Sequence, residues 1–212
     1  DLGASPGATH DFFMWLAHRD TIPSEAITKP QWEVLIQRLA RLRELDDHWV
    51  RAFVKKAVAA HPGEVIKMLQ ARLLEGARNF EFRALRRDRK GVGLALLSHP
   101  DGLTLLRDFL AWAVGQQAGR DLAMDIGSTV SGLCGKYGAD VMELLLELLS
   151  GGGQAHVDVV ASVLRSVHET FVLEETPFIR QALNQAEVVS EQAVGALSSA
   201  LWSATVTGGR SG

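Results

Sequence analysis

Apolar residues recur at spacings of three and four along most of the chain. The clearest runs are Val34, Leu35, Leu39 and Leu42; Val50, Phe53, Val54 and Ala57; Val65, Ile66, Leu69 and Leu73; and Leu105, Leu106, Phe109, Leu110 and Ala113. This spacing puts apolar side chains on one face of an α-helix. No stretch sustains the apolar and polar alternation that is typical of a half-buried strand. The pattern therefore predicts an all-α protein.

Proline marks the predicted helix starts at regular intervals. It stands ahead of an apolar run at Pro30, Pro62, Pro100 and Pro177, and Gly138 opens a similar run where the spacing leaves a gap. Proline suits the first turn of a helix, because the N–H that it lacks would have no partner there. A second helix is predicted in each unit, and these helices begin near Asp47, Arg83, Asp121, Ala155 and Val188.

These second helices start 33 to 38 residues apart. A recurrence of this length is typical of stacked helical repeats, in which each helix pair buries its apolar face against its neighbours. We therefore predict a right-handed α-solenoid of about five antiparallel helix pairs. The alternative is a non-repetitive helical bundle with proline at its helix starts.

The C-terminal units resemble the helical repeats of the HEAT and armadillo superfamily. Residues 189–201 combine small and leucine positions as the inner helix of an armadillo repeat does, and residues 144–149 look like an outer helix. The resemblance implies a surface for binding other proteins. The Trp and Asn ladder of nuclear-import adaptors is absent, since the matching pairs are Gly195 and Ser199, Ser162 and Ser166, and Ser128 and Gly132. The Asp and Arg that tie HEAT units together have scattered candidates in Asp121, Asp158 and Arg165.

Three segments are predicted. Residues 1–28 form an N-terminal capping segment, residues 29–205 the helical-repeat domain, and residues 206–212 a flexible C-terminal tail. The Gly- and Ser-rich ends and the first residue, Asp1, suggest a segment of a longer protein or a processed chain. Neither a signal peptide nor a transmembrane stretch is recognisable, so the expected location is cytoplasmic and no membrane partner is predicted.

Charge is distributed unevenly along a chain whose net charge is only -3. Residues 38–90 carry 14 basic and 7 acidic residues, whereas residues 139–212 carry 3 basic and 9 acidic ones. The small net charge gives no reason to expect a uniformly basic nucleic-acid binder. The distribution predicts a basic N-terminal half and an acidic C-terminal end.

Candidate partner-binding residues follow from this distribution. The predicted basic patch, here called the basic cluster, comprises Arg51, Lys55, Lys56, Arg83, Arg86, Arg87, Arg89 and Lys90. Successive units of a solenoid lie side by side, so the two runs are expected to adjoin; the alternative is an ordinary solvated helix face. Trp32, Trp49 and Trp112 fall at apolar helical positions and are predicted to be core residues. Trp15 is predicted either to cap the first unit or, in a segment of a longer protein, to mark a contact with the missing part; it is also a candidate partner-binding residue.

No local pattern indicates catalysis. The glycines from Gly127 to Gly132 lack the lysine of a phosphate loop and are better explained by close helix packing. The seven histidines form no His-Glu-x-x-His pair, and a lone Cys134 provides no thiolate cluster for zinc. His61 and His99 precede prolines and are predicted to satisfy backbone groups at helix ends. We therefore predict no enzyme, no cofactor, no metal and no small-molecule substrate.

The sequence thus favours a non-enzymatic scaffold or adaptor that binds a protein partner on a curved helical-repeat surface. Two alternatives remain: a nucleic-acid-binding HEAT-like protein, and a regulatory or sensor repeat within a larger multidomain protein. The acidic C-terminal third argues against the nucleic-acid alternative.

Overall fold

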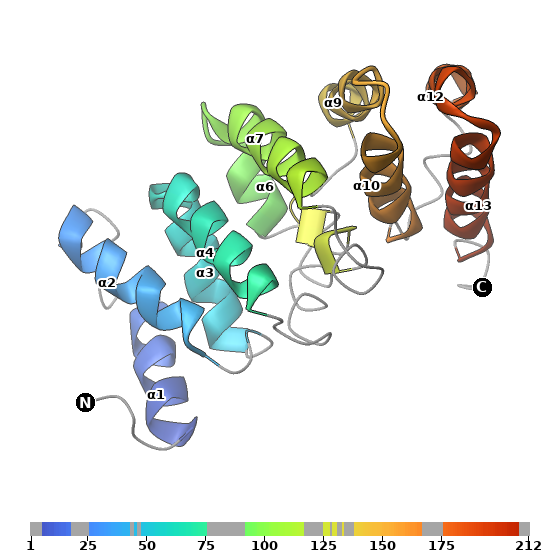
Figure 1. The fold of residues 1–212 in the computed structure, drawn as a ribbon. Coiled ribbons are helices and arrows are strands. Elements are labelled where there is room, and N and C mark those ends of the chain that lie inside the picture. Colours follow the sequence, from blue (N-terminus) through green and yellow to red (C-terminus); the bar gives the residue numbers. More distant parts are fainter. Residues whose placement is uncertain are drawn as a thin grey trace.

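The computed structural model describes residues 6–17, 26–42, 45, 48–75, 92–116, 125–127, 129–130, 133, 138–166 and 176–207 (Figure 1). Within these residues the regular structure is entirely helical, so the all-α prediction is confirmed for them. The helices are α1 (Pro6–Ala17), α2 (Lys29–Ala40), α3 (His48–Ala60), α4 (Pro62–Leu74), α6 (Val92–Leu97), α7 (Gly102–Gly115), α9 (Ala139–Leu149), α10 (Gln154–Arg165), α12 (Thr176–Val189) and α13 (Glu191–Thr207).

Local sequence explains where several helices begin. Pro30 and Pro62 lie in the first turns of α2 and α4, and Pro177 is the second residue of α12. Before α2, the Thr28 backbone N–H and hydroxyl both donate to Gln31 Oε1 at 2.9 Å. This contact between the residue ahead of the helix and its first turn is a helix-start signal that a sequence can encode.

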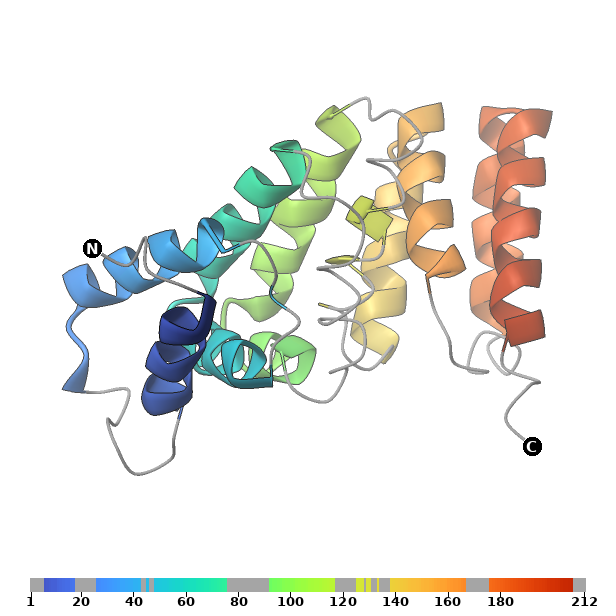
Figure 2. The ribbon, with the colours of Figure 1, turned by 90° about the horizontal axis from the view of Figure 1, so that it is seen from below.

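The helices form two rows that run along the molecule (Figures 1 and 2). The helices near the predicted proline positions make one row, in which α2 contacts α4, α4 contacts α7, α7 contacts α9, and α9 contacts α12. In the other row α1 contacts α3, α3 contacts α6, and α10 contacts α13. Contacts between the rows join α3 with α4, α6 with α7, α9 with α10, and α12 with α13.

The predicted second helices fall in the second row where the structure describes them. α3 begins at His48 and α10 at Gln154, each one residue from the predicted start. α13 begins at Glu191, three residues after the predicted Val188, because α12 extends to Val189 and Ser190 forms the turn. The predicted starts at Arg83 and Asp121 lie outside the described residues.

A continuous apolar core lies between the rows. At the N-terminal end it is aromatic: the rings of Trp32 and Phe53 stack with centroids 5.5 Å apart, and Phe13 lies 5.2 Å from Phe53. Trp32 is only 1% exposed, as predicted, whereas Trp49 and Trp112 are half-buried. These contacts attach both α1 and α2 to α3, and α1 lies within the segment predicted as a cap.

A buried arginine joins two neighbouring helices of the first row. Arg72 on α4 is buried, and its Nη1 lies 3.0, 2.7 and 2.7 Å from the carbonyl oxygens of Leu39, Ala40 and Leu42 at the end of α2. Carbonyls at a helix C-terminus lack intrahelical donors, and a cation there also interacts favourably with the helix dipole. Arg72 therefore stabilises the α2–α4 contact, a role that the sequence did not assign to it.

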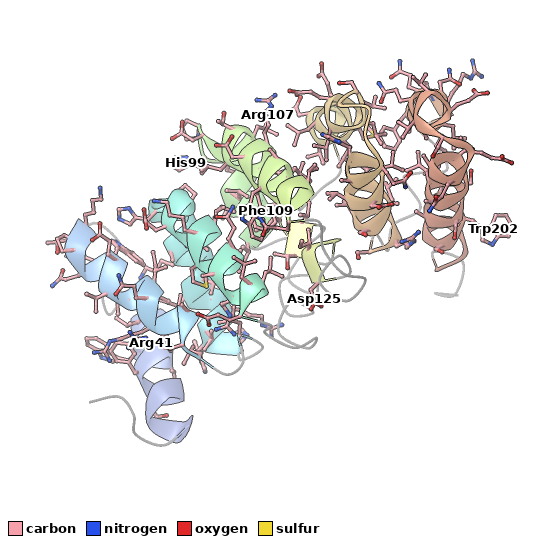
Figure 3. All side chains as sticks on the ribbon, in the orientation of Figure 1. Arg41, His99, Arg107, Phe109, Asp125 and Trp202 are labelled. Carbon is pink, nitrogen blue, oxygen red and sulfur yellow. The ribbon has the colours of Figure 1, made fainter. Side chains whose placement is uncertain are left out.

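The described residues predicted to tie HEAT-like units together make fewer hydrogen bonds than Arg72 does. Arg165 Nη2 donates to the Ala196 carbonyl at 3.4 Å and so joins α10 to α13. Asp158 accepts a 2.9 Å hydrogen bond from Gln154 within its own helix. Asp121 lies outside the described residues. On the surface, Arg107 of α7 pairs with Glu147 of α9 at 2.9 Å (Figure 3).

Candidate protein-interaction surfaces

The basic cluster is described only on α3. Lys55 is exposed there, and Arg51 and Lys56 are half-buried. Arg83, Arg86, Arg87, Arg89 and Lys90 lie outside the described residues. Whether the two runs adjoin therefore stays a prediction.

Lys56 has a structural contact within the N-terminal end. Its Nζ donates to the Leu16 carbonyl at 3.5 Å. Leu16 is in the last turn of α1, where carbonyl oxygens have no intrahelical donor, so an ammonium group there is stabilising. The contact also places the C-terminal turn of α1 beside the Lys56 ammonium of α3.

Trp15 is exposed in that same turn of α1. Its side chain is 52% exposed, and the adjacent Met14 is 37% exposed, while Phe13 and Leu16 are buried. Tryptophan provides a large apolar area at little entropic cost and is enriched at the energetic centres of protein interfaces. Trp15 on α1 and two cations of the contacting helix α3, Arg51 and Lys55, are together called the aromatic-cationic surface.

Sequence reasoning missed a pocket at the opposite end. It has a volume of about 490 Å³ and is lined by Leu183, Asn184 and Glu187 of α12 and by Glu191 and Val194 of α13. Leu183 and Val194 are half-buried and supply apolar walls, whereas the two glutamates are exposed. We call it the acidic pocket.

A short, well-anchored turn fixes the geometry of this pocket. Ser190 is the single residue between α12 and α13, and its Oγ accepts the backbone N–H of Ala193 at 3.0 Å, as an N-cap does. The same hydroxyl donates to Gln154 Oε1 of α10 at 3.3 Å. The two glutamates therefore extend from rigid helix ends on either side of a capped turn. A signal was present in the sequence, since Glu187 and Glu191 flank Ser190 in the most acidic third of the chain.

The acidic pocket has no internal charge compensation. Among the residues that the structure describes, no cation forms an ion pair with Glu187 or Glu191. Glu191 lies in the first turn of α13, where the positive end of the helix dipole favours a carboxylate. Glu187 lies in the last turn of α12, where the negative end of the dipole disfavours one.

The glycines and histidines singled out in the sequence have local structural roles. Gly127 packs directly on α10, since a Cβ there would lie 2.4 Å from the Ser162 carbonyl oxygen. Gly152 adopts a positive φ of 73° in the α9–α10 turn. His99 Nδ1 accepts the Asp101 backbone N–H at 3.2 Å, as predicted for a helix-end residue. The His61 ring lies 5.6 Å from that of Trp32.

The part of the chain that the structure describes lacks two further features. No three His, Cys, Asp or Glu side chains there are grouped so that they would hold a metal ion. None of the described helices combines the length and apolar character that crossing a membrane requires.

Comparison with known proteins yields no relative. The sequence matches no protein-family model, and neither a curated protein nor a solved structure is significantly similar to it. The HEAT and armadillo resemblance therefore remains a prediction from sequence pattern.

Proposed function

We propose that this protein is a non-enzymatic interaction module, an α-solenoid of helix pairs that binds a protein partner through the aromatic-cationic surface. The two-row arrangement supports the proposal, because each helix contacts mainly its neighbours and an extended surface remains available. In this account Trp15 is the apolar anchor, and Arg51 and Lys55 select an acidic segment of the partner.

The observation that carries this proposal is the exposure of Trp15 on an anchored helix. A tryptophan that is 52% exposed leaves apolar area in water, although Phe13 and Leu16 of the same helix are buried in the core. The core holds α1 through the Phe13–Phe53 contact, so the exposed indole sits on a rigid element. Rigid presentation reduces the entropy that an anchor loses when it binds.

The test is affinity purification with quantitative cross-linking in cell extract, comparing wild type with Trp15→Ser/Lys55→Glu. We expect the recovered amount of one specific cross-linked protein to be at least tenfold lower with the double variant than with wild type. The matched control is Lys29→Glu/Val34→Ser, which makes the same kind of changes at exposed positions of α2. Retention of every cross-linked protein by Trp15→Ser/Lys55→Glu would refute the proposal.

A second measurement separates a protein partner from nucleic acid. Binding to duplex and single-stranded DNA is titrated from low to high salt, since phosphate contacts weaken steeply as salt is added. We expect no saturable binding at 50 mM salt. Tight, salt-sensitive binding that Lys55→Glu weakens would favour the nucleic-acid alternative instead.

A further inference from the structure

We propose that the acidic pocket is a second docking site, which receives an arginine or lysine side chain from a basic, extended segment of a partner protein. The inference rests on the proposed interaction function and adds a site of opposite charge at the other end of the molecule. Its ligand chemistry follows from the five lining residues.

The pocket matches both parts of a long basic side chain. Arginine and lysine have an apolar stem and a charged head, and they pack the stem on apolar surface while the head reaches polar groups. Leu183 and Val194 provide half-buried apolar walls for the stem. Glu187 and Glu191 provide carboxylates for the head, and the Asn184 side chain supplies an additional hydrogen-bond acceptor.

Local electrostatics favour a cation in this position. Both carboxylates lack an ion-pair partner among the described residues, and Glu187 also faces the unfavourable end of the α12 dipole. A bound guanidinium would offset both effects and can pair with a carboxylate through two parallel hydrogen bonds. The nearest exposed cation on α12 is Arg180, seven residues before Glu187, which is roughly 10 Å along the helix.

The size of the pocket favours a peptide segment over a single ion. A volume of about 490 Å³ lies within the range of roughly 300–1,000 Å³ that is usual for ligand pockets, and it exceeds what one side chain fills. The exposed Trp202 lies further along α13, eight residues beyond Val194, and projects away from α10 (Figure 3). An extended segment that carries a basic residue and a more distant apolar residue would contact both the pocket and Trp202.

The test is fluorescence anisotropy with a labelled octapeptide of alternating Arg, Leu, Lys and Ala. We expect saturable binding to wild type at low salt, and at least a tenfold weaker Kd for Glu187→Gln/Glu191→Gln. The matched control is Asp140→Asn/Glu143→Gln, which removes two exposed carboxylates from α9 and should change the Kd less than twofold. Val194→Ser, which keeps both carboxylates, should weaken binding severalfold, because it removes apolar contact with the stem.

Three results would overturn the inference. The first is that wild type does not bind the peptide at millimolar concentration. The second is that both double-carboxylate variants lose peptide binding equally. The third is a concentration-dependent dimer that Glu187→Gln/Glu191→Gln abolishes, because the occupant of the pocket would then be a second copy of the chain. The two proposals can fail separately, since Trp15→Ser/Lys55→Glu should bind the octapeptide as wild type does. A failure of peptide binding would refute the acidic pocket as a docking site and would not refute the proposed role of the aromatic-cationic surface.

Discussion

The two ends of the molecule build the same two-row arrangement from different side chains. Around α1 to α4 the interior is filled by large rings and crossed by a buried arginine. Between α9 and α13 the buried positions hold mainly leucine and valine, together with small residues, namely Ala161, Ser162, Ala182, Ala186, Ala193 and Ala200. Large side chains hold an interface by the area they bury, whereas small ones let helix backbones approach closely.

The side chains that fill each end determine which substitutions it tolerates. An aromatic core loses most when a ring is removed, because a cavity remains. A closely packed small-residue interface loses most when volume is added, because backbone has to move. Removal of volume should therefore be most costly at the N-terminal end, and addition of volume at the C-terminal end.

The largest effect is expected from Phe53→Ala. Phe53 is fully buried and contacts both Phe13 and Trp32, so its removal leaves a cavity at the junction of three helices. We expect a loss of about 4 kcal/mol in the free energy of unfolding, measured by urea denaturation. A loss below about 1 kcal/mol would show that the aromatic core does not hold this end together.

Arg72→Met tests the polar tie at the same end. Methionine keeps much of the volume but removes the donor to the carbonyls of Ala40 and Leu42, while the Leu39 carbonyl still accepts the Leu42 backbone N–H. We expect a loss of about 3 kcal/mol, because unsatisfied buried acceptors are costly. Arg107→Met is the control: its bridge to Glu147 is exposed on both sides, and its removal should cost less than about 1 kcal/mol.

Gly127→Ala probes the C-terminal packing. The added methyl would clash with the backbone and side chain of Ser162, and only a shift of the helices relative to each other would make room for it. We expect a loss of about 2 kcal/mol. Unchanged unfolding would show that the helical segment at 125–127 does not rest against α10.

Gly195→Ala is the matched change at an open position and should have the smallest effect. Gly195 is exposed within α13, and an added Cβ would meet open space beyond the backbone of its own helix. Alanine has the higher helix propensity, so we expect a gain of about 0.5–1 kcal/mol. A destabilised variant would mean that other atoms contact this exposed face of α13.

Local signals made much of the fold predictable. Proline fixes φ at helix starts, so Pro30, Pro62 and Pro177 indicated α2, α4 and α12 from sequence alone. Apolar spacing likewise identified Trp32 as a core residue. Long-range contacts were not predictable in this way. Arg72 reaches carbonyls 30 to 33 residues away, and nothing in its own helix indicates them.

The sites were less predictable than the fold for the same reason. Trp15 drew attention by its residue type, but its exposure depends on how α1 packs against α3. The acidic pocket requires α12 and α13 to meet across a one-residue turn, so spacing alone suggested charge and not a cavity. The basic run at residues 83–90 lies outside the described residues and stays a prediction.

Small-angle X-ray scattering tests most directly whether the helix pairs form an extended array, with the aromatic-cationic surface and the acidic pocket at opposite ends. A compact globular protein of this length has a radius of gyration of about 17 Å. We predict a clearly larger value and an elongated distance distribution for the monomer, because units contact mainly their neighbours. A value near 17 Å with a symmetric distribution would contradict the account, since the aromatic-cationic surface and the acidic pocket would then belong to one compact body.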